Sequence, residues 1–232
     1  MQLIMKVSAI IAAAGTGKRM GGNVPKQYLE LAGRPVICHT LDCIRDARWI
    51  DSVVVVVEPG RESSFKREIL EVEGYPGAWL VTAGGSFRQE SVAKGLSMVP
   101  AECDVVLVHD GVRPFVTPEI MERASEVAFR DGACIVAARV KETIKRANAE
   151  GRIEETVDRD GLWGAQTPQC FRRELLISAM ERARRENFVG TDESSIVERV
   201  GARVTVLEGD SRNIKITTPD DLSVAEALLR NR

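Results

Sequence analysis

Short apolar runs alternate with amphipathic segments along almost the whole chain, and this alternation constrains the possible folds more than any other feature. The first run, residues 7–13, is continuously apolar and leads into a glycine-containing turn, as expected of a strand buried on both faces. We predict further strands of this type at residues 53–57, 79–82, 105–109 and 134–140. The segments between them predict helices at residues 36–45, 62–73, 89–98 and 119–130.

Strands that alternate with helices form right-handed crossovers and a mostly parallel sheet covered on both faces. The expected fold class is therefore α/β, a Rossmann-like doubly wound sheet. The C-terminal part predicts a helix at 173–187, a capped helix from about Thr191, a strand at 203–207 and a helix at 219–230. With 232 residues, 44% of them hydrophobic, the chain can bury a core without metal or disulfide bonds. We expect one domain over residues 1–232.

Residues 141–164 interrupt this pattern. The segment is polar and lacks helical periodicity, and the turn-like residues from Asn148 to Gly151 predict a β-hairpin. Its strands are too polar to form a core, and an isolated hairpin is only marginally stable in water. The pattern leaves two interpretations open: a surface excursion, or an arm that pairs with a second subunit.

Charge and composition exclude several classes of protein. Lys and Arg number 32 against 34 Asp and Glu, a net charge of −2, so a basic protein that wraps nucleic acid is not expected. No apolar run reaches membrane-spanning length, so no membrane partner is expected. The five cysteines are dispersed without a C-x-x-C pair, which predicts buried, reduced thiols in a cytoplasmic protein. An anionic substrate therefore requires cations that are clustered locally.

The turn after the first strand is a candidate binding site. It reads Ala-Ala-Ala-Gly-Thr-Gly-Lys-Arg-Met from residue 12 and fails two known phosphate-binding patterns. A Walker loop needs glycine in place of Ala12 and a hydroxyl residue in place of Arg19, and a dinucleotide fingerprint needs glycine in place of Met20. The small-residue turn can still bind phosphate through backbone N–H groups, assisted by Lys18, Arg19 and Lys26. The alternative is a plain glycine-rich connection with solvated cations.

This turn, followed by Pro-Lys-Gln-Tyr-Leu at residues 25–29, resembles the signature of the sugar nucleotidyltransferases. Within them it is similar to the 2-C-methyl-D-erythritol 4-phosphate cytidylyltransferase family. Matching blocks continue in family order over essentially the whole chain, at residues 84–92, 108–114, 142–145, 156–163, 166–169, 191–193 and 213–222. Each block alone is weak, and together they are highly specific.

The resemblance implies an enzyme of the non-mevalonate isoprenoid pathway. It would transfer CMP from CTP to 2-C-methyl-D-erythritol 4-phosphate, as a phosphate oxygen attacks the α-phosphorus and pyrophosphate leaves. A phosphate monoester is already an anionic nucleophile, so no general base is required, which agrees with a chain of two histidines. The step mainly needs positive charge around the reacting phosphates.

Four residues are implied as catalytic by the resemblance: Arg19, Lys26, Arg159 and Lys215. Arg19 and Lys26 would contact the triphosphate, and Lys215, from a strand expected at 213–216, would bridge the reacting phosphates. Gly85 would let the chain approach the cytosine, and Ser91 would face it. The full CTP-binding set implied is Ala13, Ala14, Gly15, Thr16, Gly17, Lys18, Arg19, Lys26, Gly84, Gly85, Ser91, Asp110 and Lys215.

The resemblance also implies a site for the polyol phosphate. Without the resemblance, Asp110 and Arg113 are equally well interpreted as a local ion pair. With it, Asp110 would face the ribose and polyol hydroxyls, and Arg113 would help position the substrates. Mg²⁺ is implied as cofactor, held mainly by the CTP phosphates, with no protein metal site. The polyol-binding residues implied are Asp110, Arg113, Thr143, Arg159, Thr167, Thr191 and Lys215.

For the arm, the resemblance implies exchange across a two-fold homodimer. Thr143 and Arg159 would reach the partner's active site, and a guanidinium matches the geometry of phosphate oxygens. Two composite sites would result.

Three alternatives remain. A ribitol-5-phosphate cytidylyltransferase shares the CTP turn and Lys215, and only the arm and the pocket of Thr143, Arg159 and Thr191 distinguish the two. A non-catalytic nucleotide-binding module is disfavoured because the charged candidates all remain. A uridylyl or guanylyl transferase would usually require a longer chain.

Overall fold

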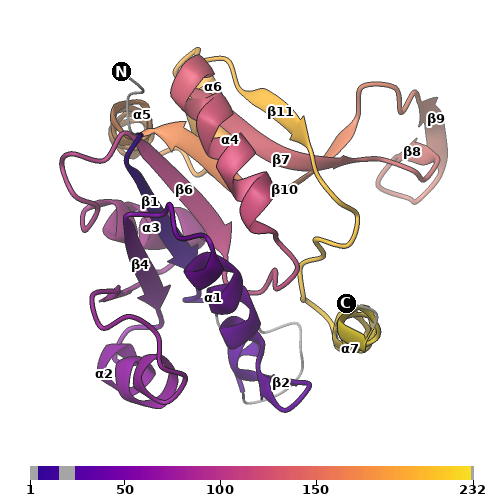
Figure 1. Ribbon diagram of the computed structural model, residues 1–232. Coiled ribbons are helices and arrows are strands. Elements are labelled where there is room, and N and C mark those ends of the chain that lie inside the picture. The colour runs from indigo at the N-terminus through magenta and orange to yellow at the C-terminus, as the bar shows by residue number, and fades with distance from the viewer. Residues whose placement is uncertain (1–4, 16–23, 231–232) are drawn as a thin grey trace.

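The computed structural model describes residues 5–15 and 24–230, and over these residues one sheet of seven strands runs through the molecule (Figure 1). The strand order is β11-β7-β10-β6-β1-β4-β5. All neighbouring pairs are parallel except the two that β10 makes with β6 and β7. The strands are β1 (Val7–Ala12), β4 (Ser52–Val57), β5 (Leu80–Ala83), β6 (Val105–Asp110), β7 (Ala133–Arg139), β10 (Trp163–Arg172) and β11 (Thr205–Glu208).

Helices cover both faces of the sheet. Successive strand residues point to opposite faces, so Ile11 belongs to the core under one layer of helices and Ile10 to the core under the other. The first layer is α1 (Val36–Asp46), α2 (Glu62–Phe65), its π-helical continuation η3 (Lys66–Glu71) and α4 (Pro118–Asp131). The second is α3 (Arg88–Leu96), α5 (Arg173–Arg185) and α6 (Glu193–Arg199). The predicted doubly wound α/β fold is confirmed.

Two helix starts follow the expected chemistry. The Thr117 side chain accepts a hydrogen bond from the backbone N–H of Ile120, and Pro118 occupies the first turn of α4. The helix expected near Thr191 begins at Glu193, capped by Asp192 in a reciprocal capping box with Ser195.

Strand β10 was missed by the sequence analysis. It contains Thr167, Pro168 and Gln169, a polar and proline-containing stretch that does not resemble a central strand. The strand is accommodated because its register shifts between Ala165 and Gln169 and because its buried polar groups find partners. Thr167 pairs with the His109 ring, and the Gln169 amide donates to Asp192.

The strand expected at residues 213–216 is wrong. This segment is irregular and lies outside the sheet, and its Ile216 N–H donates to the Val112 carbonyl at 3.0 Å. Helix α7 (Pro219–Arg230) follows and packs, through Ala225, against the Leu31 side chain. Leu31 lies in a small hairpin of β2 (Glu30–Leu31) and β3 (Arg34–Pro35), preceded by the short helix η2 (Lys26–Tyr28).

The predicted hairpin within residues 141–164 is present. Strands β8 (Ile144–Ala147) and β9 (Ile153–Val157) pair antiparallel, and the Asn148 side chain accepts from the backbone N–H groups of Glu150 and Arg152 in the turn. Figure 1 shows the hairpin projecting from the body at the ends of β7 and β10. Within the described part of the chain, no helix is long and apolar enough to span a membrane.

Candidate functional site

Four parallel strands end side by side and carry the predicted nucleotide-binding turns. Backbone hydrogen bonds link these turns: Ala13 N–H to the Val56 carbonyl at 2.8 Å, Gly84 N–H to Val57 at 2.7 Å, and Gly111 N–H to Ala12 at 3.0 Å. The carboxyl edge of an open parallel sheet is the usual ligand-binding position in such folds. The structure thus places the 13–15 turn, the 84–85 turn and the end of β6 around one edge.

Gly84 is required by close packing. A Cβ at this position would lie 2.4 Å from the Ala14 Cβ, well inside contact distance. The Ser91 hydroxyl accepts from the Gly85 N–H at 2.9 Å and donates to the Phe87 carbonyl at 3.1 Å. Ser91 is buried and holds this turn in shape, and its expected contact with cytosine stays a prediction.

The first predicted phosphate-binding turn is partly described. Ala13, Ala14 and Gly15 continue from β1, and Thr16, Gly17, Lys18 and Arg19 lie outside the described residues. Lys26 is the first residue of η2. The next residue, Gln27, links this short helix to the end of β1. The buried Gln27 amide donates to the Ala13 carbonyl at 2.7 Å and also bonds the Glu58 carboxylate. Gln27 was not singled out from the sequence, although it lies within the matched block at 25–29.

Asp110, the last residue of β6, is the centre of a buried charge cluster. Its Oδ2 lies 2.9 Å from Lys215 Nζ and 3.3 Å from Arg113 Nε, and its Oδ1 lies 3.3 Å from Arg88 Nη2. The carboxylate side chain is 7% exposed. Burial alone raises the pKa of Asp110, but the charges of Arg88, Lys215 and Arg113 outweigh it and hold the pKa well below its usual range.

Lys215 lies far from Asp110 in sequence and is brought to it by the fold. The irregular segment that contains Asn213 also carries Lys215, and Arg113 holds this segment by donating to the Asn213 carbonyl at 2.7 Å. The Asn213 amide donates to the Thr167 carbonyl at 2.9 Å. The fold therefore brings together four predicted residues: Asp110, Arg113, Thr167 and Lys215. The local ion pair between Asp110 and Arg113, the other interpretation of these residues, is present as well.

His109 supports the cluster from inside the sheet. The Thr167 hydroxyl oxygen accepts from the Asp110 N–H, so its proton is available to donate to His109 Nδ1, 2.9 Å away. The other ring nitrogen, Nε2, then donates to the Arg113 carbonyl at 3.2 Å. Burial lowers the pKa of His109 to about 4, so the ring is neutral near pH 7.

Arg88 and Glu193 were missed by the sequence analysis. Arg88 Nη1 lies 2.6 Å from each oxygen of the Glu193 carboxylate, which is completely buried. Burial raises the pKa of Glu193 and the Arg88 charge opposes that rise. Arg88 was visible as one residue of the block at 84–92, but nothing in the sequence connected it with a carboxylate 105 positions away.

The predicted arm residues are not part of this cluster. Thr143 and Arg159 are exposed, and Arg159 Nη1 donates to the Lys141 carbonyl at the base of its own arm. Thr191 is also exposed, one residue before the cap of α6.

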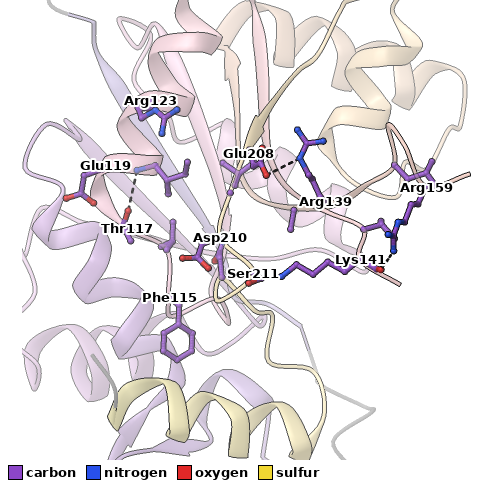
Figure 2. A pocket seen from close by; sticks show the side chains of 18 of the residues that line it. Phe115, Thr117, Glu119, Arg123, Arg139, Lys141, Arg159, Glu208, Asp210 and Ser211 are labelled. Carbon is purple, nitrogen blue, oxygen red and sulfur yellow. Dashed lines mark hydrogen bonds and ion pairs between the residues drawn. The ribbon is translucent and has the colours of Figure 1, made fainter. Parts of the chain in front are cut away.

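A pocket of about 790 Å³ lies between α4, the end of β11 and the base of the arm (Figure 2). Its charged lining is balanced, with Arg123, Arg139, Lys141 and Arg159 against Glu119, Asp160, Glu208 and Asp210. It adjoins the charge cluster through Asn213, which lines its inner end. The pocket therefore connects the base of the arm with the segment that carries Lys215. The cations of the cluster, Arg88, Arg113 and Lys215, do not line it.

Metal-binding groups and reactive thiols are the other side-chain chemistries to consider in such a site. In residues 5–15 and 24–230, no group of three or more His, Cys, Asp or Glu side chains could hold a metal ion. The five cysteines are buried and unpaired, as expected. Burial raises the pKa of Cys38 and Cys134 to about 12, so these thiols are not nucleophiles near neutral pH.

One family of known proteins matches nearly the whole chain. The family model described as 2-C-methyl-D-erythritol 4-phosphate cytidylyltransferase matches residues 7–231. The chain belongs to this family. A cytidylyltransferase of that name from Geotalea uraniireducens is 46% identical over 230 residues, covering 98% of each chain. Another from Alkaliphilus oremlandii is 41% identical over 232 residues, covering 100% of this chain and 98% of the relative.

Solved structures of the cytidylyltransferase family share the fold. The 4-diphosphocytidyl-2C-methyl-D-erythritol synthase from Anaerococcus prevotii has a TM-score of 0.87 at 32% identity, covering 98% of this chain and 97% of its own. The 2-C-methyl-D-erythritol 4-phosphate cytidylyltransferase from Thermus thermophilus has a TM-score of 0.80 at 34% identity, covering 97% and 100%.

Proposed function

We propose that this cytidylyltransferase transfers CMP from CTP to 2-C-methyl-D-erythritol 4-phosphate, giving 4-diphosphocytidyl-2-C-methyl-D-erythritol and pyrophosphate. The observation that carries the proposal is the cluster of Arg88, Arg113 and Lys215 around Asp110 at the carboxyl edge of the sheet. Three cations, Arg88, Arg113 and Lys215, face two carboxylates, Asp110 and Glu193, which leaves a local positive excess for two polyanionic substrates. Family membership supplies the identities of those substrates.

In the proposed step, a phosphate oxygen of the polyol phosphate attacks the α-phosphorus of CTP. A new P–O bond forms as the bond to the β-phosphate oxygen breaks, and pyrophosphate carries away the electron pair. Lys215, about one-third exposed and fixed by Asp110, is suited to stabilise the charge that develops on the α-phosphate. The nucleophile is already an anion, so His109, buried with both ring nitrogens bonded, is not needed as a base.

We also infer that the reaction requires Mg²⁺. Asp110, the carboxylate at the centre of the site, is the residue that would suit this ion, because Mg²⁺ accepts carboxylate oxygen as a ligand. Both Asp110 oxygens already face cations, so the CTP phosphates would hold most of the ion, and Asp110 would assist by holding its water. Mg²⁺ would neutralise phosphate charge, and the chain's own residues orient the two substrates.

The arm is proposed to exchange across a homodimer, so that Thr143 and Arg159 complete the partner's site. Both residues are exposed and lie just outside the hairpin strands, Thr143 before β8 and Arg159 after β9. A test mixes Arg159→Ala and Lys215→Ala subunits, each expected to be inactive. Mixed dimers are expected to recover activity in one composite site, and no recovery would show that the sites are not shared. Unmixed proteins treated identically are the control.

Pyrophosphate release tests the substrate. The assay supplies CTP and Mg²⁺ with either 2-C-methyl-D-erythritol 4-phosphate or ribitol 5-phosphate at equal concentration. Faster turnover of the methylerythritol phosphate is expected, and faster turnover of ribitol 5-phosphate would overturn the assignment.

The unpaired thiols fit a cytoplasmic location, because such compartments keep cysteines reduced.

A further inference from the structure

Arg88 connects two parts of the site that are distant in sequence. It is the first residue of α3, and its guanidinium faces two carboxylates at once. Nη1 bonds both oxygens of Glu193 at 2.6 Å, while Nε and Nη2 both lie 3.3 Å from Asp110 Oδ1. The planar fork of a guanidinium can satisfy both partners in fixed directions, which a lysine ammonium cannot do.

Glu193 depends on Arg88. The carboxylate has no exposed surface, and among the described residues the main charged groups that act on it are Arg88, which is positive, and Asp110 and Asp192, which are negative. A buried carboxylate without a cation is strongly unfavourable. Glu193 is therefore held in place by Arg88, and with it the first turn of α6.

The residues just before α6 are held from two sides. On one side, Gln89 of α3 donates to the Phe188 carbonyl at 3.1 Å and accepts from the Gly190 N–H at 2.9 Å. On the other side, Gln169 of β10 accepts from the Ser194 N–H at 3.1 Å and donates to Asp192 at 2.8 Å. Thr191 lies between these attachment points and is exposed. Its position is thus set by contacts of its neighbours.

We propose that Arg88 is a positioning residue that holds Asp110 and the Thr191 segment in a fixed relation to each other. Asp110 in turn fixes Lys215. The same helix carries Ser91, whose hydroxyl shapes the Gly84–Gly85 turn. Helix α3 thereby couples the side of the site expected to bind CTP with the side expected to bind the polyol phosphate. This inference rests on the proposed function, because the two sides are defined by its substrates.

Arg88→Met, Arg88→Lys and the double variant Arg88→Met/Glu193→Gln separate positioning from simple stability. Arg88→Met leaves the Glu193 carboxylate buried without a cation and is expected to lower both the unfolding midpoint and kcat. The double variant removes that buried charge, so its unfolding midpoint should return most of the way to wild type. Its kcat should stay about 100-fold low, because the guanidinium that joins Asp110 to position 193, at the start of α6, is still missing. Arg88→Lys keeps the charge but not the fork, and we expect a folded protein with intermediate kcat and a raised KM for the polyol phosphate.

The readouts are urea unfolding together with kcat and KM for each substrate, from pyrophosphate release. Arg182→Met is the matched control, because Arg182 forms an ion pair of 2.8 Å with Glu186 on the exposed surface of α5. Its kinetics should stay within about twofold of wild type, since such pairs contribute little. Wild-type kcat in the double variant, or in Arg88→Lys, would overturn the positioning role. Failure of the proposed function looks different, because wild type itself would then release no pyrophosphate.

Discussion

His109 makes the stability of this protein sensitive to mild acid. The ring is fully buried between Thr167 and the Arg113 carbonyl. Burial lowers its pKa from 6.5 to about 4. Between these two values the unfolded chain binds a proton at His109 and the folded chain does not, so the free energy of unfolding falls as the pH is lowered through this window.

The size of the effect follows from the shift. A difference of roughly 2.5 pKa units corresponds to about 3 kcal/mol, of which about 2 kcal/mol is lost by about pH 5. The structure also explains why the folded protein resists protonation. A proton on Nδ1 would take the place of the one that Thr167 donates, and the hydroxyl would lose its acceptor.

Urea unfolding followed by tryptophan fluorescence at about pH 7.5 and about pH 5 measures the effect. His109→Gln cannot titrate, so its free energy of unfolding should fall by about 2 kcal/mol less than that of wild type between these pH values. The carboxylates titrate in both proteins, so their contribution to the loss in the free energy of unfolding cancels when the two losses are subtracted. His39→Gln is the matched control, since His39 is the chain's other histidine and is only half-buried. Equal losses in wild type and His109→Gln would refute the reasoning.

Three further predictions concern the site. Lys215→Met removes the ammonium 2.9 Å from Asp110 and should lower kcat for pyrophosphate release by about 10²- to 10³-fold; near wild-type turnover would exclude Lys215 from catalysis. Gly84→Ala would place a Cβ 2.4 Å from that of Ala14, and we expect a loss of about 1–3 kcal/mol in unfolding and a raised KM for CTP. Gly77→Ala, where a Cβ meets nothing within 4 Å, should change neither quantity. EDTA should stop turnover and Mg²⁺ restore it without changing the urea midpoint, because in our proposal the metal would arrive with CTP; a lowered midpoint would indicate a protein-held ion.

The sequence by itself determined the fold class and most of the elements. Continuous apolar runs such as that of β4 specify strands buried on both faces, and the capping pattern at Thr117 specifies where α4 begins. It also placed the glycine-containing turns at strand ends, because in a parallel sheet such ends share one edge. These features are local, so a single sequence is enough to predict them.

Only the tertiary structure decided how the site is assembled. Strand β10 does not have the pattern of a central strand and becomes one because β6 and β7 pair with both its edges. Arg88 meets Glu193 across 105 positions, and Lys215 reaches Asp110 from an irregular segment outside the sheet. Each of these contacts depends on how distant segments pack, and long-range packing leaves no periodicity in the chain. The charged residues of the proposed site are therefore present in the sequence as residue types, but they form one cluster only when the folded sheet brings them together.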